Sequence, residues 1–182
     1  MSDARPRLIG VTITPAHEPP KQLSDPHELL SAYLDHYRET VLRKVDGMSE
    51  HELRTSRLPS GWTPLGLLVH LLFMEQRWFV WGFRAEPVAQ PWGDRGPGDS
   101  WQVPEGWDAE RVEAELRAQW ERSRAAVAGA ALADRAAVGG RFPTADKAPT
   151  LAWTLFHVLQ EYARHAGHLD IARELSDGAT GE

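Results

Sequence analysis

Apolar side chains recur every three to four residues in four stretches of the chain, which is the spacing of amphipathic helices. These stretches cover approximately residues 26–46, 64–82, 109–127 and 150–177. The segments between them are rich in proline, glycine and polar residues, and none alternates apolar and polar positions as a half-buried strand does. No internal repeat of roughly 20–50 residues is visible. The pattern predicts an all-α protein built as a four-helix bundle.

The expected helix boundaries follow from local capping chemistry. A short polar side chain that accepts hydrogen bonds from the first free backbone amides favours a helix start, and proline suits the first helical position. Residues with this character precede each apolar stretch, and glycines lie at the ends of the first, second and last stretches. The predicted starts are at Asp25, Thr63, Asp108 and Thr150 (with Pro149 as the alternative for the last), and the predicted ends are at Gly47, Gly82 and Gly178.

A long loop over residues 84–107 separates the second and third predicted helices. It is long enough for a crossover connection, and structureless loops of this length are usually functional. The loop contains Trp92, Trp101 and Trp107, and two interpretations of them stay open: they wall a pocket, or they only anchor the loop. The remaining tryptophans are predicted to lie in the core: Trp62, Trp78, Trp81, Trp120 and Trp153.

Composition narrows the class of protein. The chain has 182 residues, of which 42% are hydrophobic and 25% charged, so we expect one globular domain over residues 24–178, with an extended arm at 1–23 and a tail at 179–182. The net charge of −6 argues against a general binder of nucleic acid or anionic membranes. No apolar run is long enough for a membrane span or resembles a secretion signal, so the expected location is the cytoplasm. The absence of cysteine excludes disulfides, thiolate-bound zinc and a cysteine nucleophile.

Candidate chemistry lies on the last predicted helix. Glu161 and His165 are four residues apart, so they are neighbours on one helix face, within or beside the apolar stripe. That stripe is formed by Leu151, Leu155, Val158, Tyr162, Leu169 and Ala172. An ionised carboxylate in an apolar setting is costly unless a cation meets it. The spacing therefore suits chelation of one metal ion by a carboxylate oxygen and an imidazole nitrogen.

His70, at the edge of the apolar stripe of the second predicted helix, is the candidate for a third ligand. Two histidines and one carboxylate leave coordination positions open, as a catalytic metal requires. The alternative stays open at this point: a histidine on an apolar face is often only hydrogen-bonded, and a Glu-x3-His pair is often a surface pair.

Further residues near these helices have less specific roles. His157 and His168 are expected to support the ligands or line the edge of a pocket, and Trp78 is expected beside them. Arg77, Arg84 and Arg164 are placed to meet a substrate carboxylate, or are simply solvated. No role is assigned to the histidines in polar surroundings, which are His17, His27, His36 and His51.

Two segments resemble the DinB superfamily: "SGWTPLGLLVHLLFMEQRWF", which begins at Ser60, and "LFHVLQEYARHAGHLDIAREL", which begins at Leu155. The closer similarity is to its mycothiol-dependent branch, including maleylpyruvate isomerase, although no extra C-terminal domain like that of the isomerase is apparent. The resemblance implies a four-helix bundle in down-up-up-down order. It also implies a divalent metal, zinc or nickel, held by His70, Glu161 and His165, and homodimer formation.

Three functions are compatible with a four-helix bundle that has this predicted metal site. The leading hypothesis is a metal-dependent thiol S-transferase or isomerase, which joins a low-molecular-weight thiol such as mycothiol to a small electrophile. The second is a hydrolase in which water activated by the metal replaces the thiol. The third is a non-catalytic metal-binding or stress-response bundle. A requirement for added thiol separates the first from the other two.

Overall fold

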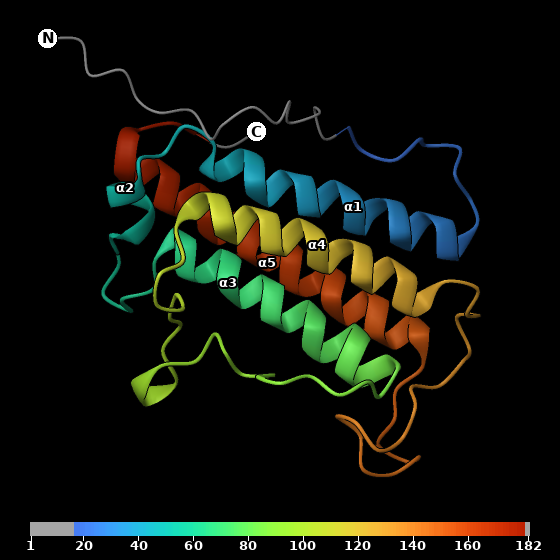
Figure 1. Ribbon diagram of the computed structural model, residues 1–182. Coiled ribbons are helices and arrows are strands. Elements are labelled where there is room, and N and C mark those ends of the chain that lie inside the picture. Colours follow the sequence, from blue (N-terminus) through green and yellow to red (C-terminus); the bar gives the residue numbers. More distant parts are fainter. Residues whose placement is uncertain (1–16, 181–182) are drawn as a thin grey trace, which may run out of the picture.

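The computed structural model describes residues 17–180. These residues form helices joined by loops, and they contain no strand beyond two isolated bridges, Arg95 with Trp101 and Arg135 with Thr150. The all-α prediction is thereby confirmed (Figure 1). The elements are α1 (Pro26–Val45), α2 (Glu50–Arg54), α3 (Pro64–Glu75), the π-helical segment η1 (Gln76–Phe83) that continues α3, the 3-10 turn η2 (Pro97–Asp99), α4 (Ala109–Val127) and α5 (Leu151–Asp177).

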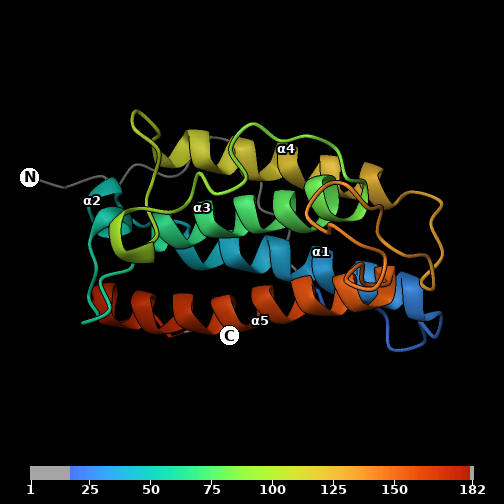
Figure 2. The ribbon, with the colours of Figure 1, turned by 90° about the horizontal axis from the view of Figure 1, so that it is seen from below.

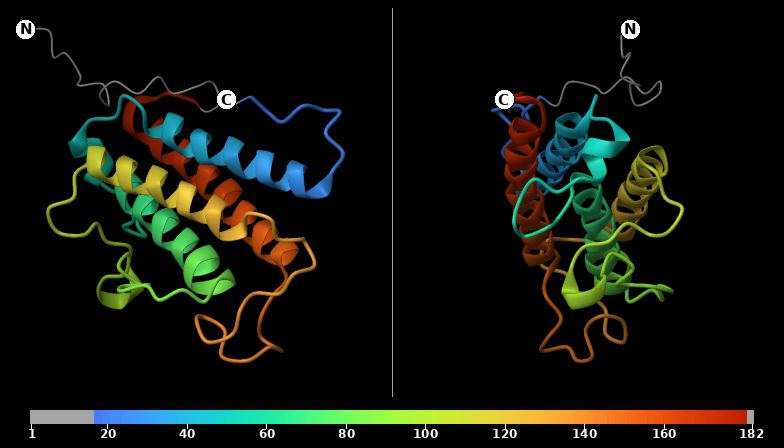
Figure 3. Two further views of the ribbon diagram at one scale, coloured as in Figure 1. Left: turned by 45° about the vertical axis from the view of Figure 1, so that its right-hand side comes forward. Right: turned by 90° about the vertical axis from the view of Figure 1, so that its left-hand side faces the viewer.

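The four long helices run in down-up-up-down order. Helices α1 and α5 point one way, whereas α3 and α4 point the other way (Figure 1). Because α3 and α4 are parallel, the loop over residues 84–108 must return along the length of the bundle before α4 begins (Figure 2). Seen along the bundle, α1 and α5 lie on one side and α3 and α4 on the other (Figure 3, right). The predicted crossover connection is confirmed.

The predicted helix starts are confirmed by their caps. The side chain of each residue accepts a backbone amide from the first helical turn, which satisfies a donor that the helix itself leaves free. These residues are Asp25, Thr63, Asp108 and Thr150. Gly178 ends α5 in the left-handed conformation, with φ of 77°. Of the predicted N-terminal arm and C-terminal tail, residues 1–16 and 181–182 lie outside the described part of the chain.

Two local features were not predicted. The connection after α1 contains α2, which begins with a capping box in which Ser49 and Glu52 cap each other's backbone amides. The second long helix widens into the π-helical segment η1. A side chain at Gly82 would place its Cβ 2.8 Å from the carbonyl oxygen of Arg77, so this wider turn requires glycine. No helix in residues 17–180 has the length and apolar character needed to cross a membrane.

The predicted core stripe of α5 is buried, and so is Trp120. Trp62, Trp78 and Trp81 are half-buried. The core prediction was wrong for Trp153, which is 51% exposed. Residues two positions apart on an α-helix differ by about 200° around the axis. Trp153 therefore points away from the stripe that contains Leu151.

A buried polar network joins the four long helices. The carboxylate of Glu75 on α3 is fully buried and accepts two hydrogen bonds from Arg38 on α1, at 2.8 and 2.7 Å. It also accepts one from the hydroxyl of Tyr162 on α5, at 2.7 Å. The Tyr162 hydroxyl in turn accepts a bond from Nε1 of Trp120 on α4, at 2.9 Å. Each hydrogen bond of this network joins two different helices, so the network specifies how the helices align.

The charges in this network depend on one another. Burial alone would lower the pKa of Arg38, but the adjacent Glu75 carboxylate outweighs burial and raises it. Burial and the same carboxylate raise the pKa of Tyr162 well above its usual value. A buried ion pair contributes little net stability, whereas removal of one partner leaves a buried charge without compensation.

Glu75→Gln should therefore destabilise the protein by about 3–5 kcal/mol, because Arg38 keeps its charge, loses its buried counter-ion and retains only the half-exposed Asp35 carboxylate. The free energy of unfolding in urea measures this loss. The matched control is Glu121→Gln, which removes an ion pair with Arg124 at a side chain that is 75% exposed. The control should cost about 0–1 kcal/mol. Equal losses in the two variants would contradict the assigned role of Glu75.

Candidate metal centre

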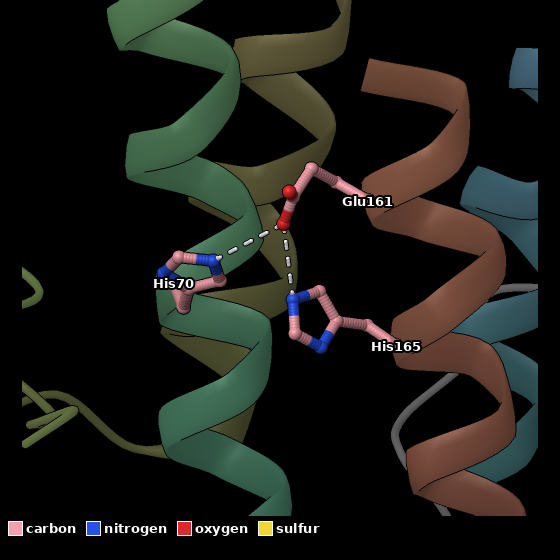
Figure 4. Close-up of side chains that lie close together, drawn as sticks. All are labelled: His70, Glu161 and His165. Atoms are coloured by element: carbon pink, nitrogen blue, oxygen red, sulfur yellow. Dashed lines mark ion pairs between the residues drawn. The ribbon is translucent and has the colours of Figure 1, made fainter. Parts of the chain in front are cut away.

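Three side chains from two helices converge between α3 and α5 (Figure 4). The Oε2 atom of Glu161 lies 3.3 Å from Nε2 of His165 and 3.9 Å from Nε2 of His70. One ligand atom from each residue lies within 4.8 Å of the other two. In the part of the chain that the structure describes, no other three histidine or acidic side chains meet in this way. The three residues predicted as metal ligands are therefore close enough to hold one ion.

The helices explain this convergence. Glu161 and His165 occupy successive turns on one face of α5, and α3 presents His70 to that face. The His165 side chain is almost completely buried, whereas those of His70 and Glu161 are 15% and 18% exposed. The centre is thus mostly buried, and only parts of the His70 and Glu161 side chains are exposed.

The protonation states suit metal ligands. Hydrogen bonds with His165 and then His70 lower the pKa of Glu161 strongly, although burial opposes the shift. Glu161 is consequently an ionised carboxylate at neutral pH. Burial lowers the pKa of His165, although the bond with Glu161 opposes this shift. His165 therefore favours the neutral imidazole, which is the form that binds metals.

Asp94, in the long loop, orients His70. Its Oδ2 atom lies 3.0 Å from Nδ1 of His70, so Nδ1–H donates to the carboxylate and Nε2 is the ring nitrogen that faces Glu161. Burial lowers the pKa of His70, but the hydrogen bonds with Asp94 and Glu161 outweigh burial and raise it. Burial would raise the pKa of Asp94, but the hydrogen bonds from His70 and Arg77 outweigh burial and lower it.

Arg77 holds Asp94 in place. Two of its nitrogens donate to the two carboxylate oxygens of Asp94, at 2.6 and 3.0 Å, and one also donates to the carbonyl of Pro91. Both Arg77 and Asp94 are buried. A Cβ at the neighbouring Gly93 would lie 2.5 Å from the Phe73 ring, so glycine is needed for the loop to approach α3 this closely. Arg77 is thus paired with Asp94.

Trp101 covers the centre. Its ring stacks on the His70 ring, with 4.4 Å between centroids and 18° between planes, and it meets His165 edge-on at 5.2 Å. Trp92 and Trp107 instead pack against arginines: Arg77 and Arg95 lie over Trp92, and Arg111 lies over Trp107. Both interpretations of the loop tryptophans therefore apply. Trp101 walls the site, and the other two anchor the loop.

A family model described as mycothiol-S-transferase matches residues 29–178. The chain belongs to the mycothiol-S-transferase family. The matched range includes all three converging side chains and the loop that carries Asp94 and Trp101. A search of curated proteins found no match.

The two further histidines of this mycothiol-S-transferase family member flank the centre. Nδ1 of His168 lies 3.1 Å from Nδ1 of His165, and Nε2 of His157 lies 3.9 Å from Oε1 of Glu161. The His157 ring stacks on Trp153 at 5.1 Å and lies 4.3 Å from Trp78. Burial lowers the pKa of His157. His157 and Trp78 therefore lie beside the centre, and His168 orients His165.

The other predicted arginines lie further out. Arg164 is exposed on α5, and Arg84 is an exposed residue 3.8 Å from Glu86. Sequence reasoning missed Asp94, which reaches the centre from the loop. Its only signal was an acidic residue in a Pro- and Gly-rich stretch.

Asp94→Asn should lower the pKa of His70 in the metal-free protein. The substitution removes an ionised acceptor that favours the imidazolium, and the opposing effect of burial remains. Imidazole NMR signals followed through a pH titration measure the change. Asp99→Asn is the control, because this exposed carboxylate in the same loop pairs with Arg95 instead. An unchanged His70 pKa in Asp94→Asn would contradict the orienting role of Asp94.

Proposed function

We propose that the protein is a divalent-metal-dependent mycothiol S-transferase whose metal ligands are His70, Glu161 and His165. The observation that carries this proposal is the convergence of two imidazoles and one carboxylate in a member of the mycothiol-S-transferase family. Zinc binds histidine nitrogen and carboxylate oxygen at about 2.0–2.2 Å, so ligand atoms around a tetrahedral ion are about 3.4 Å apart. The separations of 3.3 and 3.9 Å from the Glu161 oxygen fit such an ion.

A divalent cation held there would act as a Lewis acid that favours the thiolate form of the cosubstrate at neutral pH. In the transfer, the thiolate sulfur forms a bond to an electrophilic carbon, and the leaving group departs with its bonding electron pair. The chain contains no cysteine, so the sulfur must come from the cosubstrate. The thiol proton needs an acceptor, and His157, whose Nε2 faces Glu161, is our candidate.

The surrounding residues would prepare this centre. Asp94 would hold the His70 Nδ1 proton, which leaves the Nε2 lone pair for the metal ion, and His168 would do the same for His165 by accepting its Nδ1 proton. Trp101 lies over both histidines and limits the access of water. We further propose that the protein acts in the cytoplasm, on a small electrophile.

Metal content tests the ligand assignment. Protein purified without a histidine tag should contain about one equivalent of zinc or nickel, and His165→Ala should lose it, because two ligands hold a metal far more weakly than three. Elemental analysis measures both. His51→Ala is the control, since this histidine is exposed on α2. Absence of metal from the native chain, even after reconstitution, would refute the proposed centre.

Thiol dependence tests the reaction. The metal-loaded protein should accelerate S-conjugation of mycothiol with an activated aryl or alkyl halide. In a separate measurement, Asp94→Asn should weaken the affinity for zinc about 10–100-fold, because His70 loses the carboxylate that orients it. Product formation and zinc titration measure the two effects. Turnover of an ester without any thiol would instead indicate a hydrolase. No turnover of either kind, with metal bound, would leave a metal-binding bundle and contradict the proposal.

A further inference from the structure

The loop between α4 and α5 is docked closely against the end of η1. The amide of Arg141 donates to the carbonyl of Trp81 at 3.1 Å, and that of Ala137 donates to the carbonyl of Phe83 at 2.9 Å. A Cβ at Gly140 would lie only 2.2 Å from the Trp81 oxygen, so glycine permits this approach. The loop lies at the end of the bundle where η1 ends and α5 begins (Figure 1). Arg141 therefore has a defined position.

The Arg141 side chain has aromatic neighbours but no anion. Its guanidinium lies 4.1 Å from the ring centroid of Trp78 and 5.7 Å from that of Trp92. Within residues 17–180, its buried Nη1 atom has no hydrogen-bond partner, and no carboxylate forms an ion pair with it. Burial, followed by repulsion from Arg77 and Arg95, lowers the pKa of Arg141 to about 10. The guanidinium is still charged at neutral pH.

The neighbouring arginines show what Arg141 lacks. Arg77 and Arg95 also lie over the ring of Trp92, at 4.5 and 4.1 Å. Each of them has its own carboxylate, Asp94 for Arg77 and Asp99 for Arg95. A guanidinium presents several donors in a planar fork that matches a carboxylate. An anionic ligand would satisfy the free donors of Arg141 and relieve the repulsion among three cations.

Trp78 connects this position to the metal centre. Arg141 lies over the Trp78 ring, whose centroid is also 4.3 Å from that of the His157 ring. His157 in turn faces Glu161. Trp78 also lines a cavity of about 360 Å³ together with Phe142 and Trp153. Arg135, Lys147 and Asp146 also border this cavity, with two positive charges and one negative charge, and Arg141 adjoins it through Trp78. A ligand with an apolar or planar body and an anionic end suits these surroundings.

We propose that Arg141 binds the carboxylate of an anionic, partly planar electrophile whose reactive carbon lies toward the metal centre. The inference rests on the proposed function for the identity of the ligand as a substrate, and it adds the substrate's charge class. In the reaction the thiolate attacks carbon, the C–S bond forms, and the leaving group departs as an anion. The carboxylate takes no part in bond changes, so Arg141 is a binding and specificity residue.

The first test uses binding alone. Benzoate and its neutral analogue benzamide are titrated calorimetrically into the wild-type protein, Arg141→Gln, Arg141→Lys and Arg95→Gln, with metal present and after its removal. Benzoate should bind more tightly than benzamide. Arg141→Gln should weaken the affinity for benzoate at least about tenfold, because a hydrogen bond to a charged group is lost. Arg141→Lys should retain part of the affinity. Arg95→Gln is the matched control, because Arg95 lies over the same tryptophan but already pairs with Asp99.

The outcomes for Arg141 are separable from those for the proposed function. Equal benzoate affinity in wild type and Arg141→Gln, with an unchanged melting temperature, would overturn the inference and show that Arg141 only stacks on tryptophan. Failure of wild type to prefer benzoate over benzamide would overturn it as well. If benzoate binding depends on Arg141 but no thiol transfer occurs, the anion site stands and the transferase proposal fails.

A second test applies when transfer activity is present. The pair 4-(chloromethyl)benzoate and 4-(chloromethyl)benzamide offers the same reactive carbon with and without a negative charge. Arg141→Gln should raise the KM for the benzoate at least about tenfold and leave the KM for the benzamide unchanged. An equal loss on both electrophiles would mean that Arg141 acts on the structure, not on the substrate's charge.

Discussion

The hydrogen bond from Tyr162 to Glu75 sets the register between α3 and α5, and the metal centre depends on that register. Tyr162 is the neighbour of Glu161 in the chain, and Glu75 follows His70 on the same helix by little more than one turn. A shift of α3 along α5 by one turn would therefore separate His70 from Glu161 and also leave the buried Glu75 carboxylate without Tyr162. The cost of leaving buried hydrogen-bonding groups without a partner opposes such a shift. Arg38 and Trp120 extend the same constraint to α1 and α4.

The helices and the loops contribute differently to the site. Helices α3 and α5 supply the three proposed ligands, whose positions follow from regular helical geometry. The loops supply the groups around the ligands: Asp94 orients His70, Trp101 covers the histidines, and Arg141 adds an uncompensated positive charge nearby. This division is common in enzymes, where a rigid scaffold positions the reactive group and the loops determine which substrate reaches it. We therefore propose that residues 84–108 and 128–150 determine which substrate is accepted.

Much of the scaffold could be predicted from the sequence because it is encoded locally. The helix starts at Asp25, Thr63, Asp108 and Thr150 need only a capping side chain and an apolar period, and the pairing of Glu161 with His165 needs only helical spacing. His70 was proposed as their partner from its place at the edge of the apolar stripe of a second helix, and the resemblance to a known superfamily implied the same three residues.

The loop contributions could not be predicted in this way. Asp94 acts on a residue 24 positions away in the chain, and Arg141 acts near aromatic rings of two other segments, so no periodic pattern marks either of them. Arg77 illustrates the same limit. Its position near the centre was predicted, but its charge is taken up by Asp94, whose place depends on the close packing of Gly93 against Phe73. Trp153 was assigned to the core from its residue type, although its helical phase points outward.

The most direct test of the central claim is X-ray absorption spectroscopy at the metal edge of the zinc- or nickel-loaded protein, before and after addition of mycothiol. Because the chain has no cysteine, any sulfur neighbour of the metal beyond its three methionines must come from the thiol. The account predicts only nitrogen and oxygen neighbours before addition, and one sulfur neighbour afterwards. A spectrum that mycothiol leaves unchanged, with metal bound by His70, Glu161 and His165, would contradict the account.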